Sequence, residues 1–323
     1  MFLRNFVAQL LICVIFEDNK HAVRARSIRG DKVVKTYEKS FEDKKKLLQY
    51  VDNLSQNFQI YYIGAFFDAS EQALVPVLGA GELGKFGIDS RQTQSLTLLN
   101  AQICAPKPSV REYKRLFEDY GELDLLFSPF MLLYHCINTK TKLKKDKNTL
   151  FVFRHSIYLA LIICENKRIS FGKFYDLSTQ NIVNLDENSI SLDEMPDAEV
   201  GEEVAGLIRE DASENAPQNA PANADEAAQN APDERYIANS AMDLSNFGSD
   251  MDMCSCIFGG VQEFYTNSLY EAKFIDEVVF FDNSDISQAV LDYIEGEIFI
   301  KPEVVKIDTF NLMNELMRKE LEI

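Results

Sequence analysis

Residues 10–40, LLICVIFEDNKHAVRARSIRGDKVVKTYEKS, contain three runs of strand-forming residues separated by two short polar turns. The runs are rich in Val, Ile, Leu, Tyr and Thr, residue types that fit a pleated and half-buried surface. The turns, EDNK at 17–20 and RGD at 29–31, contain residues that favour chain reversal. The segment therefore predicts a three-stranded meander, with strands at 10–16, 22–28 and 32–40.

The same pattern returns in residues 149–177, TLFVFRHSIYLALIICENKRISFGKFYDL, which predict strands at 149–153, 157–165 and 168–177. The elements expected after the first meander are a helix at 42–56 with Ser40 as its cap, a strand at 59–67, a helix at 110–120 with a capping box of Ser109 and Glu112, a strand at 123–127 and a helix beginning at Ser128-Pro129. The elements expected after the second are a helix near 261–269, a strand at 277–281, a helix at 286–295, a strand at 304–307 and a final helix capped by Asp308. An internal repeat constrains the whole fold, so we expect an α/β protein of two lobes that each open with a three-stranded meander.

Residues 191–241 interrupt the second lobe with a composition that predicts disorder. They are rich in Asp, Glu, Ala, Asn and Pro, so they cannot bury enough apolar surface to offset the entropy of ordering. Fifteen of the 51 acidic residues lie between 186 and 234, where they account for most of the net charge of −18. We expect a first lobe at 1–146 and a second lobe at 147–190 and 242–323, with the C-terminal helix free to pack back on the first lobe and 191–241 as a disordered acidic insertion.

Composition and charge restrict the classes of function. An acidic chain lacks the clustered Lys and Arg that displace counterions from phosphates, which argues against direct nucleic-acid binding. The six cysteines lie in apolar contexts and are interpreted as buried thiols; Cys254 and Cys256 have no second pair nearby, so no metal site is expected. The apolar run near the N-terminus is interrupted by polar residues and is interpreted as a buried strand, and no segment reaches the roughly twenty apolar residues of a membrane span. We therefore expect a cytoplasmic protein.

Motifs for catalysis are weak. The stretch GAGELGK at 79–85 partly matches two phosphate-binding patterns, but Phe86 occupies the place where a P-loop needs Ser or Thr, and Gly87 would break the helix that a dinucleotide motif needs. We interpret it as a glycine loop. Acidic residues interpreted as strand ends or helix caps rather than acid-base pairs are Asp124, Asp276, Asp282, Asp285 and Glu297.

Two meanders, each followed by helix and strand, resemble the actin-like (ribonuclease H-like) fold and, more narrowly, pilus-assembly proteins of the PilM type and the cytoplasmic domain of the secretion protein GspL. Active members of this superfamily carry Asp-x-Gly turns in the first hairpin of each lobe and a Gly-Gly turn after a late strand. The corresponding turns here are EDNK at 17–20, FRHS at 153–156 and FDNS at 281–284. The residues that the resemblance assigns to this degenerate cleft are Asp18, Asn19, Lys20, Arg154, His155, Ser156, Asp282, Asn283 and Ser284. Because glycine lets the backbone approach a phosphate closely, its loss from all three turns predicts no catalytic residue, no metal and no bound cofactor.

The resemblance implies a non-catalytic cytoplasmic scaffold at the inner-membrane platform of a bacterial type IV pilus, type II secretion or DNA-uptake (competence) system. Its implied partner is a single-span inner-membrane protein, bound through its cytoplasmic tail in a surface groove, so that membrane association is indirect. An assembly ATPase is a further candidate partner, and a homodimer is left open.

Two alternatives remain open. The first is an active actin-like ATPase or phosphotransferase that binds ATP and Mg²⁺ between the lobes, with Asp18 holding magnesium-bound water and Arg154 and His155 contacting phosphate. The second is an α/β interaction protein without the actin-like plan, which a structure lacking two equivalent meanders would favour.

Overall fold

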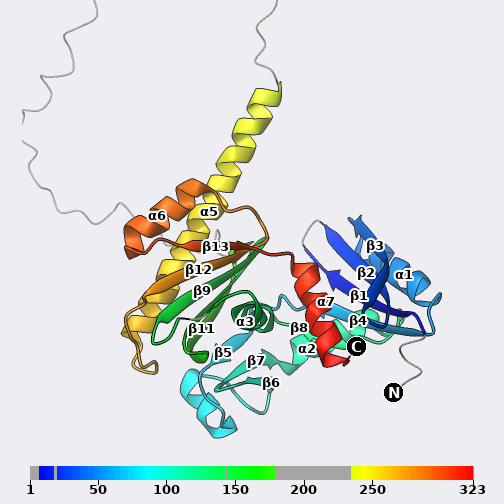
Figure 1. Cartoon of the computed structure of the whole chain (residues 1–323), viewed down its shortest axis with the longest axis horizontal. Helices are drawn as coiled ribbons and strands as arrows, with labels where there is room; N and C mark the ends of the chain where they lie inside the picture. Colours follow the sequence, from blue (N-terminus) through cyan, green and yellow to red (C-terminus); the bar gives the residue numbers. More distant parts are fainter. Residues whose placement is uncertain (1–6, 18–19, 143, 179–233, 323) are drawn as a thin grey trace, which may run out of the picture. The chain divides into compact units, whose positions relative to one another are not determined.

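The computed structural model describes residues 7–17, 20–142, 144–178 and 234–322, with no description of the side chains of 234–249 (Figure 1). Residues 1–180 and 248–323 belong to one compact unit, to which all the strands belong. The second unit, 181–247, is described only from residue 234, within α5 (Glu234–Thr266). The architecture below is that of the first unit.

The first lobe is built on a five-stranded sheet with the order β3-β2-β1-β4-β8. Its strands are β1 (Gln9–Ile15), β2 (His21–Arg29), β3 (Lys32–Phe41), β4 (Ile60–Phe66) and β8 (Leu125–Phe127). β1 runs antiparallel to β2 and parallel to β4, while β3 pairs antiparallel with β2. Every residue of β1 is buried because the strand is central and covered on both faces, which explains its continuous apolar sequence. The predicted first meander is confirmed.

The second lobe repeats this sheet with the order β11-β10-β9-β12-β13. Its strands are β9 (Asn148–His155), β10 (Tyr158–Glu165), β11 (Arg168–Asp176), β12 (Glu277–Asp282) and β13 (Glu303–Lys306). The directions also repeat, since β9 is antiparallel to β10 and parallel to β12, and β12 is parallel to β13. The second meander is confirmed, and the second alternative, an α/β interaction protein without two equivalent meanders, is wrong.

A three-stranded sheet inserted in the first lobe was not predicted in full. It has the order β5-β7-β6 and contains β5 (Ala73–Val75), β6 (Thr93–Leu98) and β7 (Ala101–Pro106). The stretch expected to be a glycine loop forms the 3₁₀ helix η2 (Ala80–Phe86), which ends at Gly87 with φ of 71°. Four of the six residues of β6 are exposed and the two at its ends are partly buried, so burial does not alternate along the strand.

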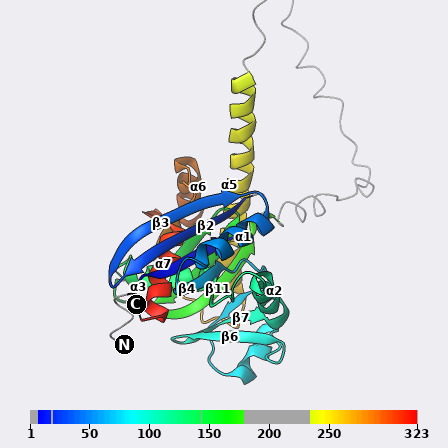
Figure 2. The same ribbon diagram turned by 90° about the vertical axis from the view of Figure 1, so that its right-hand side faces the viewer.

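Helices cover both faces of the two large sheets (Figures 1 and 2). They are α1 (Lys44–Ser55), α2 (Lys107–Phe117), α3 (Pro129–Thr139), α5, α6 (Gln288–Ile298) and α7 (Thr309–Glu320). One face of the first sheet packs on α1 and α2, and one face of the second sheet packs on α5 and α6. The remaining faces share one continuous core with α3 and α7, in which Leu11 of β1, Phe153 of β9 and Met313 of α7 are each fully buried. Burying each such side chain contributes about 1.5–3 kcal/mol, so this core joins the lobes.

Helix starts were predicted with mixed success. Ser128 and Asp308 cap α3 and α7 as expected, through side-chain oxygens that accept the N–H groups of Phe130 and Asn311. The prediction for α1 was wrong: its cap is Asp43, because Ser40 is still paired with Ala22 in the β2–β3 ladder. The capping box proposed for α2 was also wrong. That helix begins at Lys107, directly after β7, and has no side-chain cap.

The helix α5 begins earlier than predicted. It starts at Glu234 rather than near 261, so 234–241, the last part of the range predicted to be disordered, is helical. Residues 191–233 of that range lie outside the described residues. Adding a residue to an existing helix needs no new nucleus, so the buried part of α5 around Ile257 and Phe264 can extend the helix into a polar sequence.

Candidate functional site

The candidate site lies where the predicted turns of the two lobes converge. The parallel pairing of β9 and β12 puts Arg154 directly opposite Asp282, so that the turns after these two strands are neighbours. Glu17, at the end of β1 in the first lobe, comes within 3.4 Å of His155 in the second. Asp18 and Asn19 lie outside the described residues, and Lys20 is exposed. The structure thus brings six of the nine predicted residues together and adds Glu17.

His155 fills the position between the lobes. Its side chain is 6% exposed, and its ring lies 5.2 Å from the ring of Phe66 at the end of β4. Its Nδ1 is 3.0 Å from the hydroxyl of Thr309, the first residue of α7, and 3.1 Å from the amide nitrogen of Asn283. The imidazole therefore joins β9, β12, α7 and the first lobe in one packed cluster.

The backbone N–H groups of the two turns in the second lobe are already used. Ser156 donates to the hydroxyl of Ser284 (3.0 Å), and Asn283 donates to the carbonyl of Arg154 (3.2 Å). Ser284 and Ile286 donate to the carboxylate of Asp282, at 3.1 and 2.9 Å. In phosphate-binding turns such groups point at the ligand. Here each of them has an acceptor within the protein.

Asp282 holds its turn together as an ionised carboxylate. It is fully buried and also accepts from Lys306 Nζ at 2.8 Å, while the same ammonium lies 2.7 Å from Asp285. Burial alone would raise the pKa of Asp282, but the hydrogen bonds from Lys306 and from two backbone N–H groups outweigh it and lower the pKa. Asp282 therefore acts as a hydrogen-bond acceptor that fixes the conformation of the turn after β12.

Arg154 points to the other face of β9 and meets α5. Its Nη2 donates to Asp250 at 2.9 Å, and Asp250 also accepts a longer hydrogen bond, 3.4 Å, from Ser287, the cap of α6. The guanidinium is almost fully buried, yet its Nε and Nη1 have no partner among the described residues. Asp250 was not predicted, because it lies on a helix 96 residues further along the chain.

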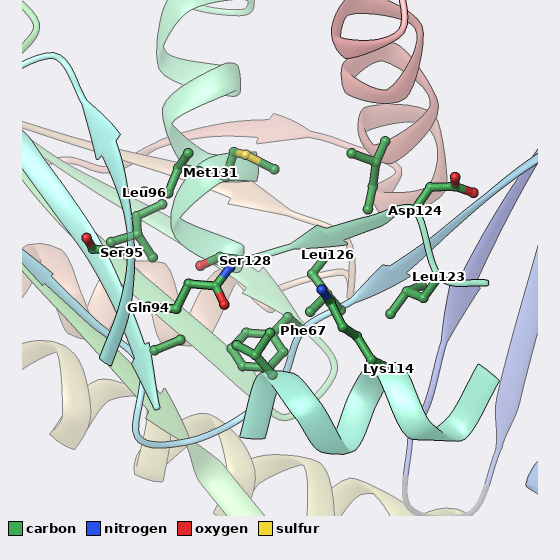
Figure 3. Close-up of a pocket in the computed structure, with 14 residues that line it drawn as sticks. Phe67, Gln94, Ser95, Leu96, Lys114, Leu123, Asp124, Leu126, Ser128 and Met131 are labelled. Carbon is green, nitrogen blue, oxygen red and sulfur yellow. The ribbon is translucent and has the colours of Figure 1, made fainter. Parts of the chain in front are cut away.

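A groove opens on the surface of the first lobe (Figure 3). It has a volume of about 280 Å³ and is lined by Phe67, Gln94, Ser95, Leu96, Ile103, Ala105, Val110, Lys114, Leu123, Asp124, Leu125, Leu126, Ser128 and Met131. Its walls come from β6 and β7, from α2 and from the β8–α3 segment. Figure 3 shows the side chain of Lys114 extending from α2 toward the groove. Most of the lining is apolar, with a few polar groups at its margin.

Two strand edges border this groove. β6 is the outer strand of the inserted sheet and β8 is the outer strand of the first large sheet. Within the described residues neither has a second strand neighbour, so each presents backbone N–H and C=O groups that can pair with an added strand. Asp124, just before β8, is engaged by the N–H of Ile63 at 2.7 Å, and burial raises its pKa.

The cysteines are buried and free, as predicted. Burial raises the pKa of Cys13 and Cys164 to about 12 and that of Cys254 and Cys256 to about 11, so these sulfurs stay as thiols at neutral pH. In the part of the chain that the structure describes, no three His, Cys, Asp or Glu side chains form a cluster that could hold a metal. Among the same residues, no helix is both long enough and apolar enough to cross a membrane.

The duplicated strand order, with each central strand antiparallel to its hairpin partner and parallel to the next strand, defines the actin-like class of fold. The turns at 153–156 and 281–284 lie at the ends of β9 and β12, and Glu17 follows β1. The chain belongs to the family described as a domain of unknown function (DUF8341), whose family model matches residues 150–322. A second family of unknown function, DUF8569, matches residues 6–134.

Solved structures with a similar arrangement have low sequence identity to this chain. An actin-like ATPase-fold protein of unknown function from Bacteroides thetaiotaomicron has 9% identity and a TM-score of 0.46, with 94% of this chain and 93% of that chain covered. A PilM-PilN type IV pilus biogenesis complex has 10% identity and a TM-score of 0.48, with 91% and 88% covered. The cytoplasmic domain of EpsL, an inner-membrane component of the type II secretion system of Vibrio cholerae, has 11% identity and a TM-score of 0.33, with 56% and 74% covered. No curated protein matches the sequence.

Proposed function

We propose that this protein is a non-catalytic actin-like scaffold that binds a tail segment of a membrane protein and does not hydrolyse nucleotide. The observation that carries the first half of this proposal is the internal use of the backbone N–H groups of Ser156, Asn283, Ser284 and Ile286. A phosphate placed at these turns would have to break existing hydrogen bonds. It would also have to displace the buried His155 from Phe66 and Thr309.

The groove of Figure 3 supports the second half. An extended peptide can add a strand to the free edge of β6 or β8 and place alternate side chains in the apolar lining. Lys114 has no carboxylate within 4 Å among the described residues, so it is available to an acidic group of the bound peptide. The proposed ligand is therefore a short, extended, largely apolar tail that carries an acidic residue.

The proposed setting follows the resemblance of the element order to PilM-type and GspL-type proteins. It is the inner face of the bacterial inner membrane, in a pilus, type II secretion or DNA-uptake machine. There the tail would come from a single-span membrane protein, and an assembly ATPase would be a second partner.

Leu96 and Leu78 give a matched test of the groove. Leu96 lies on β6 in the groove and is 50% exposed, whereas Leu78 is 55% exposed and lies outside it. The probes are fluorescent synthetic peptides of the cytoplasmic tails of single-span membrane proteins from the same organism, read by anisotropy. Leu96→Arg should weaken tail binding at least about tenfold, since it removes an apolar contact and narrows the groove, and Leu78→Arg should leave it unchanged. Equal loss in both variants, or no binding of any tail, would contradict the proposal.

One observation leaves room for an anion, although on the α5 side of β9 rather than between the lobes. The unpartnered Nε and Nη1 of Arg154 are buried donors that an anion could satisfy. Titration calorimetry with ATP and Mg²⁺ separates the two functions. We expect no heat of binding up to millimolar ATP; micromolar binding that is abolished by Asp18→Ala would establish the alternative.

A further inference from the structure

Six lysines form a basic surface on the first lobe of this acidic protein. Lys32, Lys35 and Lys39 belong to β3, and Lys44, Lys45 and Lys46 form the first turn of α1. We call this set the β3–α1 lysines. The full chain carries a net charge of −18, so six lysines within fifteen residues make this segment far more basic than the chain as a whole.

β3 and α1 are neighbouring elements of the first lobe, and their labels mark them in Figure 2. Alternate residues of a strand share a face, so Lys35 and Lys39 point to the same side as Tyr37 and Phe41, which pack on the core under α1. The ammonium of Lys39 lies 5.3 Å from the ring centre of Tyr50 on α1, and that of Lys44 lies 4.4 Å above Phe16. Lys39 of β3 therefore reaches α1, whose first turn carries the other three lysines.

Among the described residues, these lysines have no carboxylate within 4 Å. Seven lysines elsewhere in the described residues lie within 4 Å of a carboxylate, namely Lys85, Lys140, Lys144, Lys147, Lys173, Lys273 and Lys306. Within the described part of the chain, none of the β3–α1 lysines makes such a pair. The carboxylate of Glu38, on the same strand, is held by Arg24 at 2.9 Å.

The position of three lysines in α1 works against local stability. A helix N-terminus carries a partial positive charge and favours Asp or Glu in its first turn. The first turn of α1 contains no acidic residue and three consecutive lysines, with Asp43 as the cap. Lys44 lies over Phe16, but Lys45 and Lys46 form no ion pair within 4 Å among the described residues, and a sequence that breaks a local rule commonly does so for function.

The chemistry of the surface fits a bilayer better than a folded partner. Lysine is a hydrated point charge that suits a diffuse anionic surface, whereas arginine suits bidentate recognition of single groups. The neighbouring arginines Arg24 and Arg26 are instead engaged with Asp308 and Asn311 of the α7 region. Val33 and Val34, at the start of β3, are 48% and 64% exposed between Lys32 and Lys35. Exposed aliphatic side chains flanked by lysines are suited to the headgroup boundary of a membrane.

The geometry points to a direct contact between the β3–α1 lysines and an anionic phospholipid bilayer. This contact is distinct from the tail groove and adds an electrostatic attachment to one made through a protein partner. It is salt-dependent and peripheral, because lysines that face an anionic leaflet act within about one Debye length.

Vesicle co-sedimentation of the full-length chain tests this inference. The vesicles contain phosphatidylcholine with or without 40 mole per cent phosphatidylglycerol, a composition of roughly the charge of a bacterial leaflet. The chain should bind the anionic vesicles at low salt, bind phosphatidylcholine alone at least about tenfold more weakly, and dissociate as salt rises. No binding to the anionic vesicles, or equal binding to both, would overturn the inference.

The triple variant Lys35→Glu, Lys45→Glu, Lys46→Glu tests whether the β3–α1 lysines make the contact with the bilayer. Each lysine near an anionic surface raises the affinity about fivefold, so the triple variant should bind the vesicles on the order of 100-fold more weakly than the wild type. Its melting temperature should not fall, because Glu in the first turn of α1 suits the helix dipole better than Lys. The control Lys142→Glu, Lys145→Glu, Lys301→Glu changes the net charge equally at exposed positions and should keep binding. Equal loss in the control, or complete displacement of the wild type from vesicles by equimolar polyglutamate, would reject the bilayer as the partner.

Discussion

Asp282 is the residue on which the β12 turn depends. A single buried carboxylate receives two backbone N–H groups and the ammonium of Lys306, so each acceptor position has a donor. The pKa of Asp282 lies below its ordinary value, so the ionised form stabilises the fold above the pKa of the unfolded chain, about 3.9. This contribution disappears as pH falls through the lower folded-state pKa.

Asp282→Asn should therefore destabilise the protein by about 1–3 kcal/mol at pH 7, since one amide oxygen cannot replace a charged acceptor of three hydrogen bonds. The loss should shrink as pH falls below about 4, because Asp282 of the unfolded wild type then binds a proton, and it should be smallest once pH has passed the lower folded-state pKa. Urea unfolding between pH 7 and pH 3 measures both effects. Asp285→Asn is the matched control: Asp285 binds the same lysine but is 94% exposed, and its change should be small. Equal destabilisation by both substitutions would show that stability depends on the ion pairs with Lys306 and not on the hydrogen bonds of the buried turn.

At the scale of elements, the inserted sheet is joined to the second lobe by close packing. A Cβ added at Gly172 of β11 would come within 2.6 Å of Leu74 Cβ on β5, so the two strands approach as closely as they do only because residue 172 has no side chain. Asn100, in the β6–β7 turn, exchanges two hydrogen bonds with the backbone of Ile169, at 2.7 and 2.9 Å. The inserted sheet thus connects the lobes.

Gly172→Ala should cost about 1–3 kcal/mol, because the neighbour it meets is the base of a leucine side chain and cannot turn away. Gly81→Ala, at a position with no atom near the added Cβ, should be neutral or slightly stabilising. Thermal denaturation of the two variants is the measurement. Leu74→Gly removes the contacting Cβ, so it should cost less stability in the Gly172→Ala background than in the wild type; equal costs would show that the close approach is not the cause of the loss.

Elements were predicted unevenly, for physical reasons. Both meanders were found because buried strands carry continuous or alternating apolar runs. The cap of α1 was predicted at Ser40, but Ser40 is still paired with Ala22 in the β2–β3 ladder. Local sequence does not show where a strand stops pairing, so it could not reveal this. The two-lobed plan was reached through the repeat, whereas burial along β6 does not alternate.

At the scale of the whole molecule, the two lobes share one core. The second sheet itself is completed across the long interruption, because β12 pairs in parallel with β9. Asp68, just after β4, accepts hydrogen bonds from Tyr113 of α2 and Tyr158 of β10. Burial and the nearby Asp68 raise the pKa of both tyrosines, which keeps them as donors at all physiological pH values.

Cutting the chain between the two parts of the second lobe should therefore leave an associated pair. A protease site placed after Ala205 would give two fragments, of which the first contains β9 to β11 and the second contains β12 and β13. The fragments should elute together in gel filtration and melt in one transition, since separating them would expose the core shared by Phe153, Phe281 and Met313. Separate elution of the fragments would contradict this view of the second lobe.

The sequence by itself determined the repeated meanders, the two helix caps at Ser128 and Asp308, the buried thiols and the departure of the cleft turns from glycine. These depend on local conformational preference and on apolar periodicity, which neighbouring residues fix. Only the tertiary structure decided that Arg154 meets Asp250, that His155 fills the space between the lobes, and that Arg24 reaches Asp308 across 284 residues. Such pairs are set by how sheets and helices pack, and no local pattern in the chain records them.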